Sequence, residues 1–215
     1  MLIHSCDEPP EKDDWWHFAR RPQLGHLVAP GKQRKLPVVV PTQYVLAGTP
    51  DQPEVRLHLA KANPVFSALD ESPACLLSLA GDWAFIPSSW KAIGDEDPSR
   101  GIPTTYYTAV QLLCRAELVD DEAGKASILR DQLATFEPEM DHVDPAEHAR
   151  QLPAIRGLRL TVDEVRAKFK YGGNVDEAHR SAVAEHLAAR RRPGDEAARR
   201  QVLRSIARRA GPSSL

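Results

Sequence analysis

The sequence predicts an α+β protein built on an antiparallel sheet of about six strands, closed or sandwiched, with flanking helices. Several segments alternate apolar and polar residues with a period of two, which is typical of half-buried antiparallel strands. Helical periods lie between and after these segments without a regular βαβ rhythm, which disfavours a doubly wound parallel fold. The 215 residues suit one domain, or one domain with an appendage.

Three segments carry the clearest strand pattern. In residues 54–60 apolar and polar residues alternate, which turns His58 away from the apolar face. Residues 103–118 and 157–165 repeat the alternation, and Tyr106 lies on the apolar face of the first of these. We expect further short strands at 25–30, 36–47, 74–81 and 82–87.

Five helices are predicted from the helical spacing of apolar residues. The longest places Ile128 and Leu133 on one apolar stripe. Pro193 and Asp195 divide the last two helices as a breaker and a cap. The helices are expected at 12–22, 62–72, 121–140, 175–192 and 193–209.

The net charge of −2 is unevenly distributed along the chain. Residues 189–215 carry eight arginines and two acidic residues, so this tail is near +6 and residues 1–188 are near −8. We therefore divide the chain into a domain at 1–188 and a basic helical tail at 189–215. The tail fits a contact with a partner subunit, an arm on DNA, or a plain solvated helix face.

Several classes of protein are disfavoured by the motifs that the sequence lacks. There is no signal-like start and no apolar stretch of membrane-spanning length, so we predict a cytoplasmic protein without a membrane partner. The three cysteines are too scattered for a disulfide framework or a zinc knuckle. His142 and His148 do not share a helical face, so no metal site is expected, and no common motif assigns a catalytic residue.

The first candidate site lies where strand 54–60 meets a helix. His58 faces away from the core, Lys61 adds a positive charge, and Asn63 can cap the helix or donate from its amide. A phosphate group needs positive charge and free donors, commonly at a helix start. The corner therefore fits a phosphate-bearing ligand, and it equally fits a polar turn with an N-cap.

The second candidate set comes from a turn and the strand start that follows it. Ser89 and Trp90 belong to a Pro-Ser-Ser turn, and Thr104, Tyr106 and Tyr107 begin the next strand. Aromatic rings and hydroxyls suit a planar ligand with a polar edge. Aromatic residues at strand starts are also ordinary core residues, which is what we expect of Tyr106.

The third set lies at the end of the last predicted strand. Lys168 and Lys170 share one face there, and Gly172 and Gly173 form a turn before Asn174. Two ammonium groups on one face suit an anion, although a lysine pair also protects a sheet edge from misassociation.

Taken in this order, the three sets resemble the PaiB-like FMN-binding negative transcriptional regulators of the FMN-binding split-barrel superfamily. That family's His-Leu-Ala-Arg-Ala-Asn-Pro run is residues 58–64 here, and its Pro-Ser-Trp-Tyr turn is residues 88–91. Its Pro-Thr-Trp-Asn-Tyr strand start is residues 103–107, and its Lys-x-Lys-Leu-Ser-Gln-Asn segment is residues 168–174. The resemblance covers roughly residues 1–188.

The resemblance implies a six-stranded antiparallel split β-barrel of Greek-key topology, in a homodimer that binds FMN in a groove at the subunit interface. Lys61 is expected to meet the phosphate or the isoalloxazine edge. Ten residues are then candidates for the cofactor site, namely His58, Lys61, Asn63, Ser89, Trp90, Thr104, Tyr107, Lys168, Lys170 and Asn174.

The chain departs from the family's motifs at four places. An early Thr-His-Leu-Pro strand is residues 38–41 here, and the Trp-Asn of the strand start is Thr105 and Tyr106. The tyrosine after the turn is Lys91, and Leu-Ser-Gln is residues 171–173. Each change removes a donor, an acceptor or a stacking surface, which lowers the expected FMN affinity by about 1 kcal/mol per net hydrogen bond.

Three functions follow from these observations. The first is a dimeric negative transcriptional regulator or flavin-linked sensor, with the basic tail contacting DNA. The second is an FMN-dependent oxidoreductase of the flavin-reductase or pyridoxamine-oxidase type. The third is a barrel that has lost its flavin and serves as an interaction or haem-binding module, which the three valines at 38–40 suggest.

Overall fold

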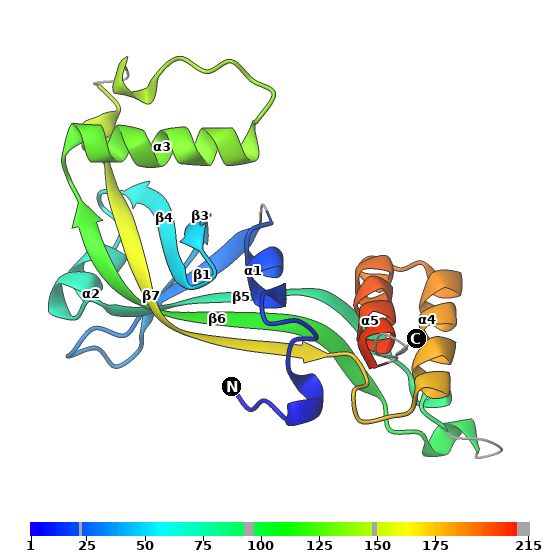
Figure 1. Cartoon of the computed structure of the whole chain (residues 1–215). Coiled ribbons are helices and arrows are strands. Elements are labelled where there is room, and N and C mark those ends of the chain that lie inside the picture. The colour runs from blue at the N-terminus through cyan, green and yellow to red at the C-terminus, as the bar shows by residue number, and fades with distance from the viewer. Residues whose placement is uncertain (22, 93–96, 148–149, 210–215) are drawn as a thin grey trace. The chain divides into compact units, whose positions relative to one another are not determined.

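The computed structural model describes residues 1–21, 23–92, 97–147 and 150–209, and Figure 1 labels their elements. The helices in these ranges are α1 (Asp14–Ala19), α2 (Val65–Glu71), α3 (Glu122–Phe136), α4 (Glu177–Arg190) and α5 (Asp195–Arg209). The strands are β1 (Leu24–Ala29), β2 (Val38–Gln43), β3 (Val45–Thr49), β4 (Gln52–Ala60), β5 (Ala74–Ile86), β6 (Thr104–Val119) and β7 (Ile155–Lys170). The α+β class is confirmed. The predicted count of six strands is wrong, because the described sheet has seven.

Two of the predicted strand boundaries are also wrong. The run 36–47 is divided into β2 and β3, because the buried side chain of Tyr44 turns inward between them and donates to the Ala19 carbonyl oxygen at 2.6 Å. The segments 74–81 and 82–87 form the single strand β5, in which Asp82 has a φ of 50°. The strand therefore continues through Asp82, where the sequence predicts the start of a separate strand.

The sheet has the strand order β2-β1-β5-β6-β7-β4-β3. Antiparallel pairs join β1 to β2 and β5, and β4 to β3 and β7. The two edge strands, β2 and β3, are separated in sequence by Tyr44 alone. Because one residue spans only about 3.5 Å, the edges must meet at this point, and the sheet must curl.

The chain forms two compact units. The first contains Met1–Trp15, Ala80–Val110 and the described residues of Ala167–Leu215, and the second contains Trp16–Leu79 and Gln111–Arg166. Strands β5, β6 and β7 contribute to both. The predicted division at 188/189 falls inside α4 and stays a prediction. Pro22, His148 and residues 210–215, which belong to predicted features, lie outside the described ranges.

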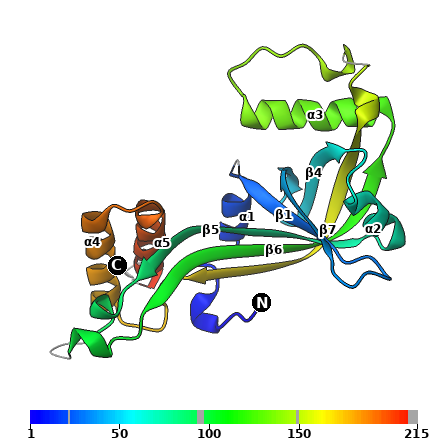
Figure 2. The same cartoon turned by 180° about the vertical axis from the view of Figure 1, so that it is seen from behind.

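In the first unit, α4 and α5 lie side by side, as Figures 1 and 2 both show. Asp176 caps α4 by accepting from the His179 backbone N–H at 2.8 Å. At the turn, the buried Asp195 carboxylate accepts from the Arg190 guanidinium at 2.6 Å and from the Arg192 backbone N–H at 2.8 Å. The core beside these helices includes Tyr106, Val110, Phe169, Tyr171, Val183, Leu187, Ala198 and Val202.

In the second unit, α3 lies along the polar face of β4. Arg56 donates to Asp131 at 2.7 Å, and His58 Nδ1 lies 2.5 Å from Gln132 Oε1. The apolar face of the sheet supplies much of the core, including Leu27, Val55, Leu57, Leu77, Leu158 and Leu160. The expectation that His58 points away from the apolar face is confirmed.

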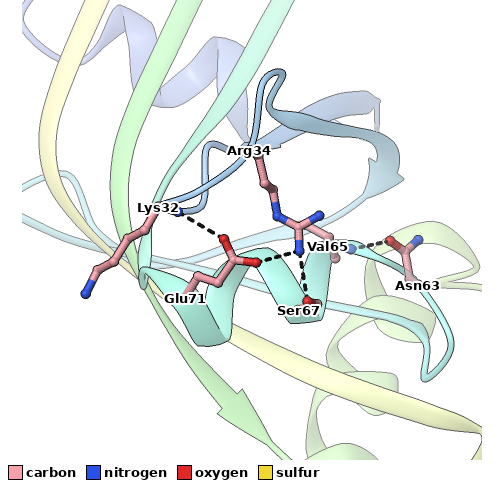
Figure 3. A network of polar contacts seen from close by, with 6 residues as sticks. All are labelled: Lys32, Arg34, Asn63, Val65, Ser67 and Glu71. Atoms are coloured by element: carbon pink, nitrogen blue, oxygen red, sulfur yellow. Dashed lines mark hydrogen bonds and ion pairs between the residues drawn. The ribbon is translucent and has the colours of Figure 1, made fainter.

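The segment before β2 is fastened to α2, as Figure 3 shows. The Glu71 carboxylate accepts from the Lys32 backbone N–H at 3.0 Å and from Arg34 at 2.8 Å. Arg34 also donates to Ser67 Oγ at 2.8 Å. These donors lower the pKa of Glu71, and the Lys32 backbone hydrogen bond is the largest cause.

Cys6, Cys75 and Cys114 are free thiols, as the sequence indicates, and burial raises the pKa of Cys75 to about 12. No helix within the described ranges is both long enough and apolar enough to cross a membrane. Those ranges also contain no group of three or more His, Cys, Asp or Glu side chains that could hold a metal ion.

We predict that Tyr44→Phe destabilises the protein by about 1–2 kcal/mol. The change removes the hydroxyl that donates to Ala19 and leaves a buried carbonyl without its partner. Chemical denaturation followed by tryptophan fluorescence measures the loss. A variant as stable as the parent would show that the hydroxyl does not hold the junction of the edge strands.

We also predict that Asp195→Asn lowers stability by about 2 kcal/mol at pH 7, because it breaks a largely buried ion pair with Arg190. The Arg190 hydrogen bond holds the pKa of Asp195 below its usual value. The parent's advantage is therefore present above pH 4 and is lost as the pH falls through that lowered pKa. Glu196→Gln, which removes an exposed carboxylate one residue on, is the control and should change stability by less than about 0.5 kcal/mol.

Candidate functional site

The ten residues predicted for the cofactor site divide between the two units. His58, Lys61 and Asn63 lie in the second unit, and the other seven lie in the first. Each group is described within its own unit.

At the strand-to-helix corner of the second unit, the Asn63 side chain caps the helix, which is one of the two roles that its sequence allows. Asn63 Oδ1 accepts from the Val65 backbone N–H at 3.0 Å, at the start of α2 (Figure 3). His58 is engaged with Gln132, as described above. The Lys61 backbone N–H donates to the Ala154 carbonyl oxygen at 2.8 Å, while the residue itself is exposed. Lys61 is therefore the member of this group with an accessible side chain.

Four of the predicted residues meet in the first unit. The Lys170 ammonium donates to Thr104 Oγ1 at 2.7 Å. Lys168 and Lys170 each place Nζ 5.9 Å from the centroid of the Tyr107 ring. The start of β6 and the end of β7 therefore bring together residues that the sequence separates by more than sixty positions.

Lys168 has a structural partner that the sequence does not suggest. Its buried side chain donates to the Leu2 carbonyl oxygen at 3.0 Å and lies 3.2 Å from Asp7 Oδ2. The Asp7 side chain is 9% exposed, so this is a buried ion pair. Lys168 thus holds the N-terminal segment on β7.

Trp90 packs within the first unit. It lies in the 3-10 helix η2 (Ser88–Trp90), and its ring stacks on His186 with 4.8 Å between centroids and 15° between planes. The Arg190 guanidinium lies 4.6 Å from the same ring centroid. Ser89 is exposed on η2. These contacts give Trp90 a role in fixing the turn against α4.

A cavity of about 500 Å³ lies in the first unit, at the ends of β6 and β7. It includes the predicted residues Thr104, Lys170 and Asn174. The remaining lining residues are Lys91, Arg100, Gly101, Ile102, Pro103, Tyr106, Gly172, Val175 and His179. Sequence reasoning missed Lys91, Arg100 and His179, because the turn before β6 and the start of α4 bring them to the strand ends. Tyr106 is buried as expected, but its ring also faces this cavity.

The electrostatics of this cavity are those of a cationic site. Burial and then the charge of Lys170 lower the pKa of Lys91. Burial and then the charge of Lys91 lower the pKa of His179, which favours a neutral imidazole at pH 7. Burial raises the pKa of Tyr106 to about 12, so its phenol stays protonated and can donate. Among the residues that the structure describes, no carboxylate belongs to the lining.

A second cavity, of about 710 Å³, lies in the second unit between α3 and the segment that follows it. Its walls are mainly apolar, and two imidazoles, His58 and His142, belong to the lining. The apolar walls are formed by Leu129, Leu133, Met140, Val143, Pro145, Leu152 and Ile155.

The described arginines of the C-terminal tail are mostly paired within the chain. Arg190 and Arg204 bond to the buried carboxylates of Asp195 and Asp14, and Arg199 and Arg200 lie 3.5 and 3.8 Å from Glu196. Within the described ranges, Arg191 and Arg192 are exposed and form no ion pair. The Arg204–Asp14 pair ties α5 to the N-terminal segment of the same unit, whereas the Glu196 pairs lie within α5.

Comparisons with known proteins agree on the fold. Protease synthase and sporulation protein PAI 2 of Bacillus subtilis (strain 168) is 22% identical over 198 residues, which cover 90% of this chain and 92% of that protein. The solved structure of the flavocytochrome Anf3 from Azotobacter vinelandii matches with a TM-score of 0.60 and 23% identity, over 80% of this chain and 74% of that one. The FAD and heme binding protein from Mycobacterium smegmatis matches with a TM-score of 0.56 and 18% identity, over 82% and 75%.

The family comparison confirms the resemblance that the motifs suggest. Residues 1–164 match the family described as "Putative FMN-binding domain". Lys168, Lys170, Asn174 and His179 lie beyond the matched residues. Because the match spans well over half of the chain, the protein belongs to this PaiB-like family of FMN-binding domains.

Proposed function

We propose that this protein is a cytoplasmic homodimer of the split-barrel type that binds FMN and acts as a flavin-linked sensor or negative transcriptional regulator. The meeting of Thr104, Tyr107 and Lys170 is the observation that supports FMN binding most directly, in a chain of an FMN-binding family. Closure of the sheet into a barrel is supported by the single residue between its edge strands.

The chemistry of these residues fits FMN, which has a phosphate group and a planar isoalloxazine ring. Lys170 supplies positive charge for the anionic end of the cofactor, and Thr104 supplies a hydroxyl. Tyr107 supplies an aromatic surface for the ring. Bound FMN supplies reversible one- and two-electron transfer, while these side chains bind and orient it.

A dimer is supported by an exposed aromatic pair on β5. Trp83 and Phe85 are 58% and 48% exposed, and as alternate residues of one strand they face the same side. Large apolar groups that stay together on a surface commonly mark an interface. We propose that a second copy of the chain covers them.

The pairing of the tail arginines favours the sensor over a regulator that holds DNA through its tail. Phosphate contacts need free cationic side chains, and four of the described arginines are already paired with carboxylates. Arg191 and Arg192, which are exposed and form no ion pair among the described residues, are where a DNA contact of the described tail would start.

A haem-binding barrel is the second candidate, and the apolar cavity of the second unit favours it. Haem needs an apolar pocket and an axial ligand, and imidazole is a common one. The cavity offers His58 and His142 within apolar walls. The absorption spectrum of the protein separates this candidate from the first, because haem and flavin bands differ.

We predict that the purified protein retains FMN at about one per chain after incubation with excess cofactor and removal of the unbound part. Lys170→Ala should weaken binding about tenfold, because it removes a charge-assisted contact. Arg192→Ala, which removes an exposed positive charge elsewhere in the first unit, is the control and should leave FMN affinity unchanged.

A colourless protein that takes up no FMN would contradict this proposal, and a Soret band lost in His58→Ala or His142→Ala would favour haem. Rapid anaerobic bleaching of bound flavin by NADH or NADPH would favour the oxidoreductase instead.

We predict that the Trp83→Ser, Phe85→Ser double variant is monomeric in size-exclusion chromatography with light scattering, where the parent is a dimer. Leu203→Ser, which removes another exposed apolar side chain in the same unit, should leave the dimer intact. A parent that is itself monomeric at all concentrations would refute the proposed interface.

A further inference from the structure

The cationic cavity of the first unit contains two polar atoms that lack partners. Tyr106 Oη and His179 Nε2 are both buried, and neither has a hydrogen-bond partner among the described residues. Both residues line the cavity. A buried polar group without a hydrogen-bond partner is destabilising, so a pair of them in one cavity indicates a partner that the described residues do not supply.

The position of the Tyr106 hydroxyl is fixed by its surroundings. It lies against Gly172, where an added Cβ would come within 2.3 Å of the hydroxyl oxygen. Gly172 has a φ of 76°, a conformation that favours glycine. The neighbouring Tyr171 anchors this turn, since its buried hydroxyl lies 2.8 Å from Thr108 Oγ1 and donates to the Asp82 carbonyl oxygen at 2.9 Å. The cavity wall is therefore held by specific contacts.

Three cationic side chains line this cavity, and its described lining contains no carboxylate. Lys91 and Arg100 form no ion pair within the part of the chain that the structure describes. Lys170 donates to Thr104 Oγ1, and the threonine O–H remains available as a further donor. Asp176, at the start of α4, is occupied as the helix cap.

The described lining thus presents positive charge and side-chain donors. Three cations with a phenol, a threonine hydroxyl and an imidazole suit a group that has several acceptor oxygens and two negative charges. A phosphate monoester has both, whereas a carboxylate has one charge and two oxygens. Burial and then the charge of Lys170 lower the pKa of Lys91, and a bound dianion would offset the charge of Lys170.

We propose that this cavity binds the phosphate group of a phosphate ester. Lys91, Arg100 and Lys170 neutralise the charge, and Tyr106 and His179 donate to the oxygens. The ester is either FMN itself, in which case the inference rests on the proposed function, or a separate phosphorylated ligand. A volume of about 500 Å³ accommodates more than the phosphate and lies within the range of small-molecule sites.

Isothermal titration of the full chain with inorganic phosphate, FMN and riboflavin tests the proposal. We expect saturable phosphate binding that weakens about tenfold or more in Lys91→Gln and in Arg100→Gln. Tyr106→Phe should weaken it several-fold without loss of thermal stability, because it removes only an unpartnered hydroxyl. Arg192→Gln, the same charge change at an exposed site of the same unit, should bind phosphate as the parent does.

The flavin titrations then identify the source of the phosphate. If phosphate competes with FMN but not with riboflavin, and Lys91→Gln weakens FMN alone, the cavity holds the phosphate of the flavin. If FMN binds with no effect of phosphate or of Lys91→Gln, the cavity serves a separate ester.

Two results would overturn the inference. A chain that binds FMN but shows no saturable phosphate binding would remove this site and leave the proposed function standing. If Arg192→Gln and Lys91→Gln weaken phosphate binding equally, phosphate affinity depends on the net charge of the protein and not on the cavity.

Discussion

The arrangement of the sheet depends on a connection of one residue. Tyr44 joins β2 to β3, and these strands are the two ends of the strand order. A link this short forces the ends of the sheet together, and the bond from its hydroxyl to Ala19 fixes where they meet. Strands β2, β1, β4 and β3 lie in the second unit, whereas β5, β6 and β7 extend into the first unit as well.

That extension explains where the cationic cavity forms. β6 and β7 are neighbours in the sheet, so the start of one and the end of the other provide Thr104 and Lys170. The segment before β6 adds Lys91 and Arg100. Gly101 packs closely against this segment, since an added Cβ there would lie 2.0 Å from the Ser88 carbonyl oxygen. Three of the lining residues, Lys91, Tyr106 and Gly172, occupy positions where the chain departs from the motifs of its family. The three substituted positions therefore lack the side chains expected at the cofactor site, and they line the cationic cavity with other side chains.

Local pattern predicts much of this architecture, and it fails where contacts are distant in sequence. Alternation placed β4, β6 and β7, and it turned His58 outward, because one apolar face decides the register of a half-buried strand. It could not find the partner of Lys168, since Asp7 lies at the opposite end of the chain. Local pattern also could not decide whether Asn63 caps a helix or binds a ligand, because both roles use the same side-chain amide. The hydrogen bond from the Val65 backbone N–H shows that it caps α2. The basic residues of the cavity come from turns and a helix start, where no periodicity links them.

The contact between Tyr106 and Gly172 has a consequence for the evolution of the family. A side chain at position 172 would occupy the space of the tyrosine hydroxyl, so the two positions are sterically coupled although they belong to different strand ends. An ancestor could acquire the tyrosine only after, or together with, the loss of the side chain at 172. Relatives should therefore show covariation between these positions, with a large phenol at one accompanied by glycine at the other.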